Sequence, residues 1–342
     1  MKNILDFDID NLRVMISASG EKSFRADQVF GWLSKGVNGF DEMKNIPKSL
    51  REKLAENFFI GLPEAVRIQE SAYDETRKIL FELPSNDKAS SRVESVFMRY
   101  KYGDSACISS QIGCNMGCKF CASTVKGLER SLSAGEMYAQ VLAMKNLSGR
   151  RIDRVVVMGI GEPFNNYESL SGFINIIHSD KGYGLSMRNI TVSTCGIIPM
   201  IDKFSEDFSQ VNLAISLHAP NNEIRKKIMP VAYRYGYDDL LAACRRYTEK
   251  THRRITFEYA MIEGLNSDSK DAEELAKKLN GQLCHVNLIP LNKVDGSTFR
   301  PASAKHVKFF EEILEKNGIT TTVRRRLGAD IDAACGQLRL RD

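Results

Sequence analysis

From about residue 104 onward, strand-like and helix-like segments of this 342-residue chain alternate regularly. Strands are predicted over 105–110, 154–159, 189–194, 211–217, 255–262 and 284–290. Helices are predicted over 133–147, 166–178, 197–206, 221–250 with a break at Gly236, 268–280 and 302–317. Such serial units indicate an α/β fold built on a parallel sheet. Six units are fewer than the eight that close a full barrel, so we expect a partial (β/α)6 barrel, with a doubly wound sheet as the alternative.

The first hundred residues follow another pattern. Residues 23–60 are predicted to form short amphipathic helices, and residues 76–83 and 92–100 are predicted to form strands. We therefore expect a small N-terminal α+β accessory domain over residues 1–95. The barrel would occupy residues 96–342, together with a C-terminal segment.

The composition says more about the cellular compartment of the protein than about its binding partners. The chain has 43% hydrophobic and 27% charged residues, which is typical of globular proteins, and its net charge of +5 decides nothing about nucleic acids. The longest apolar runs, such as residues 155–158, are too short to span a bilayer, so no membrane association is expected. Eight cysteines are too few for a disulfide scaffold, and the first twenty residues lack the features of a signal peptide. We expect the protein in the reducing cytoplasm.

Three cysteines follow the first predicted barrel strand closely, as Cys114, Cys118 and Cys121 in a CxxxCxxC arrangement. Such clustering favours a metal over a disulfide in a reducing compartment. A structural zinc site, the alternative, needs a fourth ligand, but no second cysteine pair with suitable spacing follows. An iron-sulfur cluster suits thiolate ligands, and three thiolates on a four-iron cluster leave one iron open to another ligand.

Polar residues, together with Gly161 and Leu217, lie at or just after the ends of several predicted strands, where a β/α barrel carries its active site. They are Gly161, Glu162, Ser193, Ser216, Leu217, His218 and Asn292. Each alone is more typical of a turn or cap. Together with the cysteine loop they would surround a single mouth, which favours a cofactor pocket.

Three further residues have two interpretations each. Cys335 lies among small residues near the C-terminus, and Cys107 lies on the first barrel strand. Either cysteine could be reactive or could simply pack in the core. Glu94, without other information, is interpreted as a solvent-facing strand residue.

The segments CISSQIGCNMGCKFC, MGIGEPFNN, ISLHAPNNEIR, HVNLIPLN and ADIDAACGQLR occur in this order. With them the chain resembles the radical S-adenosylmethionine (SAM) enzymes, and among these the bacterial adenine-C2 methyltransferases of 23S rRNA and some tRNAs. The resemblance implies a radical-SAM barrel with an RNA-binding accessory domain. It implies that Cys114, Cys118 and Cys121 hold a [4Fe-4S] cluster, and that the strand-end residues given above, from Gly161 to Asn292, contact SAM.

The resemblance also implies a mechanism. Cys335 would carry a methyl group as S-methylcysteine, Glu94 would accept a proton, and Cys107 would release the product by forming a transient disulfide with Cys335. Two SAM molecules would be used per turnover, and an external electron donor would be needed. We expect a monomer.

Three alternatives remain open. A related enzyme methylates carbon 8 of the same adenine and confers antibiotic resistance, but it is expected to have alanine where this chain has Pro163. A radical activase would need neither Cys107 nor Cys335. A zinc-stabilised RNA-binding protein would not cleave SAM.

Several basic clusters could contact RNA phosphates. They are Arg99 to Tyr102, Arg150 and Arg151, Arg225 to Lys227, Arg253 and Arg254, and Arg324 to Arg326. The tyrosines of the first cluster are the most suggestive, because tyrosine can stack an unpaired base.

Overall fold

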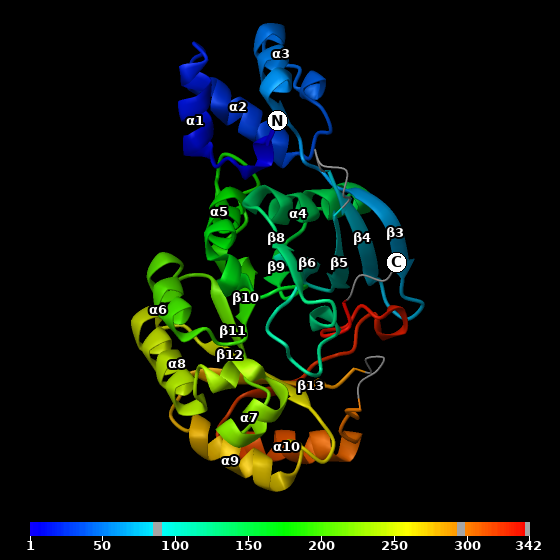
Figure 1. Cartoon of the computed structure of the whole chain (residues 1–342), viewed down its shortest axis with the longest axis vertical. Helices are drawn as coiled ribbons and strands as arrows, with labels where there is room; N and C mark the ends of the chain where they lie inside the picture. The colour runs from blue at the N-terminus through cyan, green and yellow to red at the C-terminus, as the bar shows by residue number, and fades with distance from the viewer. Residues whose placement is uncertain (85–90, 293–297, 339–342) are drawn as a thin grey trace. The chain divides into compact units, whose positions relative to one another are not determined.

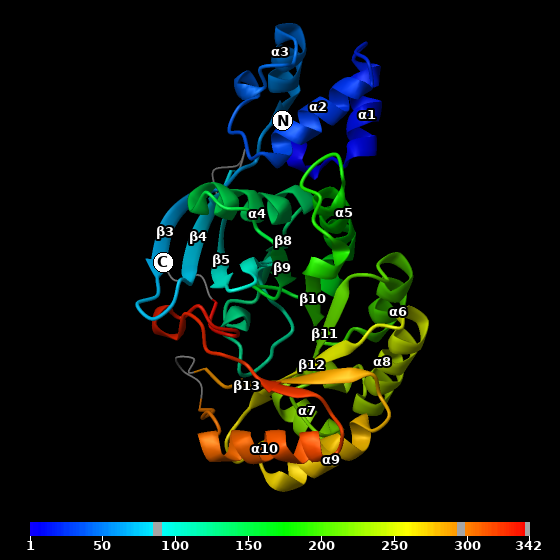
Figure 2. The same ribbon diagram turned by 180° about the vertical axis from the view of Figure 1, so that it is seen from behind.

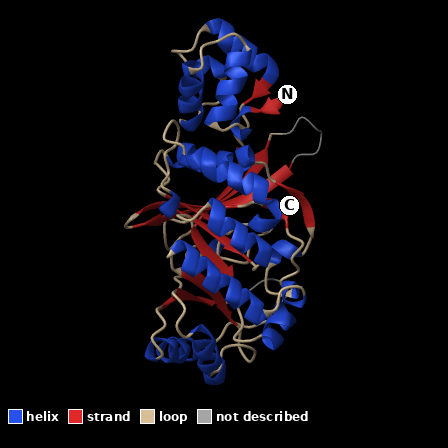
Figure 3. Cartoon of the chain, turned by 90° about the vertical axis from the view of Figure 1, so that its left-hand side faces the viewer, coloured by secondary structure: helices blue, strands red, loops and turns tan. Residues whose placement is uncertain are grey.

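The computed structural model describes residues 1–84, 91–292 and 298–338. The chain divides into two compact units. The first unit contains residues 1–112 and 130–190, and the second contains residues 113–129 and those from 191 onward. Figure 3 shows the helices and strands of the chain. Among the described residues, no helix combines the length and apolar composition that a bilayer requires.

The first unit begins with a small helical module. Its helices are α1 (Ile9–Ala18), α2 (Phe24–Ser34) and α3 (Lys48–Asn57), with 3-10 turns η1 (Ile4–Asp6) and η2 (Phe40–Glu42) and a parallel pair of short strands, β1 (Lys2–Asn3) and β2 (Phe58–Phe59). The predicted helices over 23–60 are confirmed. Helix α1 was not predicted, although Asp8 caps it by accepting a hydrogen bond from the Asn11 N–H at 2.8 Å and Leu12 and Ile16 are buried on one face.

Five strands form the sheet of the first unit. Strands β3 (Glu64–Glu70), β4 (Arg77–Leu83), β5 (Ser91–Tyr100) and β6 (Gly103–Ile108) are antiparallel neighbours, and β9 (Arg154–Val157) runs parallel to β6. Helix α4 (Ala134–Ser148) covers one face, where Ser95 Oγ donates to Gln140 Oε1 at 2.8 Å. Helix α5 (Tyr167–His178) follows the 3-10 turn η4 (Pro163–Asn166), and η5 (Met187–Asn189) closes the unit. The strands and helices predicted here are confirmed.

The helical module is attached to α4 by specific polar contacts. The Gly135 N–H donates to Asp6 Oδ1 at 2.7 Å, and a Cβ atom at Gly135 would lie 2.7 Å from the Asp6 nitrogen, so this approach requires glycine. At the other end of α4, Lys145 Nζ donates to the Lys35 carbonyl at 2.8 Å and Asn146 Nδ2 to the Gly36 carbonyl at 2.7 Å. Figures 1 and 2 show α4 directly below the module.

The second unit contains a parallel sheet. Its strands, in spatial order, are β10 (Ile190–Thr194), β11 (Asn212–Ser216), β12 (Ile255–Met261), β13 (Cys284–Pro290) and β14 (Thr321–Val323). Its helices are α6 (Ile198–Asp207), α7 (Asn222–Ile228), α8 (Tyr237–Thr251), α9 (Ser269–Leu279) and α10 (Ala304–Lys316), with 3-10 turns η6 (Pro230–Tyr233) and η7 (Ala329–Ile331). The six predicted barrel strands correspond to β6 and β9 to β13, and the predicted break at Gly236 separates α7 from α8. Strand β14 was not predicted, because three residues are too few to establish a period.

The cysteine loop lies between two short strands. These are β7 (Gln111–Gly113) and β8 (Leu128–Ser131), and the 3-10 turn η3 (Ala122–Thr124) follows Cys121. The Cys114 N–H donates to the Gly127 carbonyl at 3.0 Å, which closes the loop at its base.

Candidate active site

The second unit brings the C-terminal segment beside the cysteine loop. The Ala122 N–H donates to the Gly336 carbonyl at 2.8 Å, and Ser123 Oγ donates to the Leu338 carbonyl at 2.7 Å. Asn292, after β13, donates through Nδ2 to the Cys335 carbonyl at 3.2 Å. Two predicted site residues, Asn292 and Cys335, therefore lie together next to the loop that carries the three cysteines.

The loop itself is well defined. The Cys121 N–H donates to the Cys118 carbonyl at 3.1 Å, and the Lys119 N–H donates to the Ile228 carbonyl at the end of α7 at 2.9 Å. Cys114 is buried, while Cys118 and Cys121 are half-buried. Burial, supplemented by the nearby Cys335, raises the pKa of the Cys121 thiol.

The arrangement of donors bears on the kind of metal site. Within the described residues, no three His, Cys, Asp or Glu side chains are grouped around a common point where one metal ion could bind. A tetrahedral zinc site requires such convergence. In a four-iron cluster each thiolate binds a different iron, so three thiolates of one loop fit it without meeting at one point.

His218, two residues after the end of β11, has an unusual backbone conformation. Its φ of 54° lies in the left-handed region, and its Nδ1 accepts a hydrogen bond from the Ala260 N–H at 2.9 Å. Burial, with a smaller contribution from Arg225, lowers the pKa of His218 to about 3, so the ring is neutral at pH 7. The edge of the ring meets Phe120 of the cysteine loop, with ring centroids 4.8 Å apart.

The other strand-end residues of this unit lie where expected along the chain. Ser193 is half-buried near the end of β10, and Ser216 is half-buried at the end of β11. Leu217 is fully buried, and its N–H, like that of His218, donates to the Glu258 carbonyl of β12.

Arg225 is not a surface residue, so its predicted role in contacting RNA phosphates is wrong. Its side chain is 0% exposed and donates to the carbonyls of Cys195 at 2.6 Å and of Ser216 and Leu217 at 3.3 Å. The guanidinium thus joins the segments after β10 and β11. The sequence contains a signal for this burial, because Arg225 lies one helical turn before the buried Ile228.

In the first unit, the Gly161-Glu162 segment lies against the end of β6. Gly161 has a φ of 111°, and a Cβ atom there would lie 2.7 Å from both Ser110 Oγ and Gln111 Cβ. The Glu162 N–H donates to Gln111 Oε1 at 2.9 Å. Its carboxylate is buried and accepts a hydrogen bond from the Phe164 N–H at 3.0 Å, which caps η4.

Glu94 and Cys107 lie on the same face of the sheet of the first unit. Cys107 on β6 is opposite Val96 on β5, and side chains two residues apart in a strand share a face. Glu94 is only 5% exposed, so its interpretation as a solvent-facing residue is wrong. Lys78 on β4 forms an ion pair with it, with Nζ 3.6 Å from Oε1. Sequence reasoning missed Lys78, because nothing local indicates that a strand lysine faces inward.

Two groups of predicted site residues result, one in each unit. The first unit holds Glu94, Cys107, Gly161 and Glu162, and the second holds Cys114, Cys118, Cys121, Ser193, Ser216, Leu217, His218, Asn292 and Cys335. Cys195, Cys244 and Cys284, which were predicted to pack in the core, are buried.

Two family models match the chain. The model of the ribosomal RNA large subunit methyltransferase N-terminal domain matches residues 2–60, and that of the radical SAM superfamily matches residues 108–278. The second match and the parallel strands described above confirm the predicted radical-SAM α/β fold and its N-terminal domain.

Full-length relatives agree with these matches. A protein of Clostridium tetani named probable dual-specificity RNA methyltransferase RlmN is 49% identical over 100% of this chain and 97% of its own length. One of the same name from Clostridium beijerinckii is 47% identical over 99% of this chain and 95% of its own. The crystal structure of a radical SAM methyltransferase from Sphaerobacter thermophilus is 42% identical, covers 99% of both chains and has a TM-score of 0.94. The chain therefore belongs to the RlmN family of radical SAM RNA methyltransferases.

Proposed function

We propose that the protein methylates carbon 2 of a specific adenosine in 23S rRNA and in some tRNAs, with Cys335 carrying the methyl group as S-methylcysteine. The observation that supports this most is the position of Cys335, whose neighbour Gly336 accepts a hydrogen bond from Ala122, directly after Cys121. A radical activase would need no thiol at this place. The relatives named above, which carry the name of dual-specificity RNA methyltransferase, support an RNA substrate.

The cofactors follow from the family and the donor set. We assign the ligands of a [4Fe-4S] cluster to Cys114, Cys118 and Cys121, and the SAM contacts to Gly161, Glu162, Ser193, Ser216, Leu217, His218 and Asn292. Carbon 2 of adenine cannot displace a sulfonium methyl directly, so the cluster and SAM, when bound, supply the radical chemistry. Two SAM molecules per turnover are part of this proposal, because one donates the methyl group and the other is cleaved.

The chain's own residues carry out the remaining steps. The Cys335 thiolate is the nucleophile that accepts a methyl group, since the thiolate is the reactive form of cysteine. Glu94 accepts the proton that leaves carbon 2, and the ammonium group of Lys78 3.6 Å away stabilises its ionised form.

Product release requires a second thiol. The Cys107 thiolate attacks the Cys335 sulfur, and the bond from that sulfur to the methylene carbon on the base breaks. The electron pair of that bond stays with the methylene, which takes up a proton from solvent to become the methyl group, and a disulfide remains. An external donor of two electrons and two protons then returns both thiols. The reducing cytoplasm suits this cycle, and the protein acts as a monomer in this proposal.

The accessory domain over residues 1–95 is proposed to hold the RNA. Its helical module matches the N-terminal domain model over residues 2–60. Exposed basic residues of this module include Lys48 and Lys53, and Lys48 forms an i,i+4 ion pair with Glu52 at 3.6 Å.

Anaerobic reconstitution tests the proposal. Protein supplied with iron, sulfide, SAM and reductant should convert rRNA that lacks the modification, releasing 5′-deoxyadenosine and yielding 2-methyladenosine. Cys335→Ala should abolish methyl transfer, whereas Cys284→Ala, a change at a buried cysteine of β13, should retain it. Mass spectrometry that finds 8-methyladenosine instead, or full activity in Cys335→Ala, would contradict the proposal.

A further inference from the structure

The turn between β5 and β6 presents a stack of planar side chains. Lys101 and Tyr102 form this turn, between the paired residues Tyr100 and Gly103. The ring of Tyr102, which is 62% exposed, stacks on Tyr100 with centroids 4.9 Å apart and planes inclined by 8°. The Arg154 guanidinium carbon lies 4.4 Å from the centroid of the Tyr102 ring, and Arg154 Nη1 donates to the Tyr102 carbonyl at 3.0 Å.

This turn is held firmly by the segment that joins α4 to β9. The Asp104 N–H donates to Asp153 Oδ2 at 3.0 Å, and the Asp153 N–H donates to the Asp104 carbonyl at 2.8 Å. Gly103, with a φ of 126°, permits the contact, because a Cβ atom there would lie 2.5 Å from Asp153 Oδ2. The exposed tyrosine therefore belongs to a pre-organised surface, which loses little conformational entropy on binding.

The charged side chains around the Tyr100–Tyr102 stack favour the binding of an anion. Lys101, Arg150 and Arg151 are exposed, and Arg154 is half-exposed. The two neighbouring carboxylates are occupied within the protein: Asp153 accepts from the backbone, and Asp104, which is 2% exposed, accepts from Arg150 Nε at 2.5 Å. The solvent-facing charge of the turn is therefore mainly positive.

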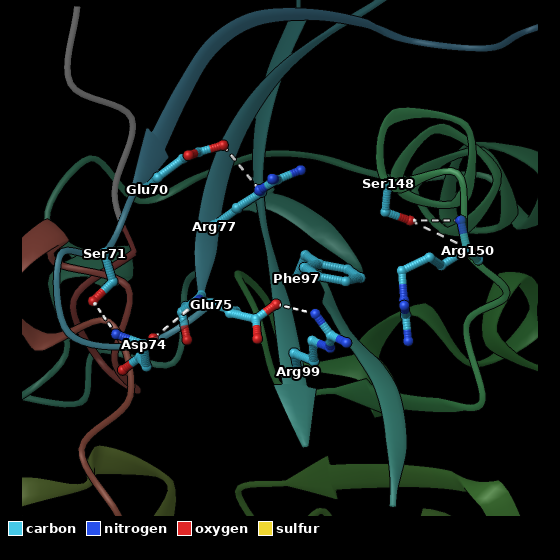
Figure 4. A pocket seen from close by; sticks show the side chains of 10 residues that line it. Glu70, Ser71, Asp74, Glu75, Arg77, Phe97, Arg99, Ser148 and Arg150 are labelled. Atoms are coloured by element: carbon cyan, nitrogen blue, oxygen red, sulfur yellow. Dashed lines mark hydrogen bonds and ion pairs between the residues drawn. The ribbon is translucent and has the colours of Figure 1, made fainter. Parts of the chain in front are cut away.

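A pocket next to this surface has a different character. It has a volume of about 320 Å³, and Figure 4 shows Phe97 between Arg99 and Arg77, with Ser148 and Arg150 on one side. Arg77 pairs with Glu70 at 2.9 Å, and Arg99 pairs with Glu75. Both carboxylates are exposed, so each offsets the charge of its arginine toward solvent. The pocket therefore has no excess of positive charge.

We propose that the hairpin tip, defined as Tyr100, Lys101, Tyr102, Arg150, Arg151 and Arg154, is a second RNA-binding surface. An unpaired base stacks on the Arg154 guanidinium, which the Tyr102 ring supports, and Lys101, Arg150 and Arg151 contact phosphates. This inference rests on the proposed RNA substrate. Strand β6 runs from the tip at Gly103 toward Ser109, so at about 3.3 Å per residue the tip is roughly 20 Å from the carboxyl end of the strand. The tip therefore contacts RNA away from the nucleotide that is methylated.

Equilibrium binding to an in vitro transcribed, unmodified 23S rRNA fragment tests the surface. Tyr102→Ala should weaken binding about 10-fold through loss of stacking, and Tyr102→Phe should bind like the wild type. The double variant Lys101→Ala/Arg151→Ala should lower the slope of log Kd against log salt by roughly 1.4 to 1.8, as expected for two lost phosphate contacts. Arg77→Ala, the matched control in the charge-balanced pocket, should not change affinity. Melting temperature and iron content establish that each variant is folded and loaded.

The outcomes separate this inference from the proposed function. If the wild type binds the fragment and Tyr102→Ala binds equally well, the tip is not an RNA surface, although the enzyme still acts on RNA. If Arg77→Ala weakens binding as much as the double variant, the loss of affinity reflects the net charge of the protein and not the hairpin tip, and the proposed surface is wrong. If the wild type itself does not bind the RNA fragment, the proposed function is contradicted, and the inference about the hairpin tip is contradicted with it.

Discussion

The backbone N–H of Ala122 and the carbonyl of Gly336 are joined by a 2.8 Å hydrogen bond, which connects the residue after Cys121 with the residue after Cys335. Two segments from distant parts of the sequence are thereby held side by side. Ser123, the next residue, strengthens the connection through its 2.7 Å hydrogen bond to the Leu338 carbonyl. Both contacts involve residues next to the proposed methyl carrier and not the carrier itself.

Removing the Ser123 hydroxyl should therefore loosen the segment that carries Cys335. We expect Ser123→Ala to lose about 1 kcal/mol of stability and to increase amide hydrogen exchange over residues 334–338, because a buried carbonyl loses its donor. Methyl transfer should fall about 5-fold with unchanged iron content. Ser205→Ala, which removes a similar bond to the Asp202 carbonyl in α6, is the control and should leave exchange over 334–338 unaltered. Equal exchange in both variants would contradict the anchoring role.

Glu94→Gln should separate proton removal from methyl loading. The amide has nearly the same shape as the carboxylate but cannot accept the proton from carbon 2, so product formation should fall about 100-fold or more. Mass spectrometry should still find the methyl group on Cys335, since loading does not need this base. A variant that makes 2-methyladenosine at the wild-type rate would remove Glu94 from the mechanism. Glu82→Gln, on the neighbouring strand, where Glu82 is half-buried and pairs with Arg92, serves as the control.

His218 should make the protein sensitive to acid. Its pKa is about 3 in the folded protein and about 6.5 in an unfolded chain, so between these values only the unfolded chain binds the proton. The free energy of unfolding therefore falls as pH decreases below 6.5, by up to about 1.4 kcal/mol per pH unit for this group.

The variant His218→Asn isolates this contribution. Asparagine tolerates a φ of 54° and does not titrate. Urea unfolding at pH 7 and pH 5 should show that the wild type loses about 2 kcal/mol more than the variant over this interval. A difference between the two proteins that is the same at both pH values would show that His218 is not held neutral by the fold.

Arg225 should stabilise the segments that end β10 and β11. In Arg225→Met, the carbonyls of Cys195, Ser216 and Leu217 lose their buried donor, and we expect a loss of about 2 to 4 kcal/mol in urea unfolding. Because Ser216 and Leu217 are proposed SAM contacts, SAM affinity should also fall.

Lys227→Met, two residues along α7, is the matched control for Arg225. Lys227 is 55% exposed and pairs with Glu223 at 3.0 Å, and such surface pairs contribute less than about 1 kcal/mol. If both variants lose the same small amount of stability, the buried guanidinium has no special role.

Local sequence patterns are sufficient to predict many of the helices and strands. The strands β6 and β9 to β13 and the helices around them were predicted within a few residues, because hydrophobic periodicity and caps act over one or two turns. The cysteine motif is equally local, since its three thiols lie within eight residues of chain. Helix α1 shows that even a capped, amphipathic segment can be overlooked in a short module.

What the sequence by itself determined is therefore the order of its elements and the chemical types available at the strand ends. Only the tertiary structure decided that Arg225 is buried under two of those strand ends, that Glu94 pairs with Lys78 away from solvent, and that Cys335 lies beside the cysteine loop. Each of these results depends on contacts between residues far apart in the chain. Such contacts follow from packing and from burial of polar groups with their partners, and no local periodicity encodes them.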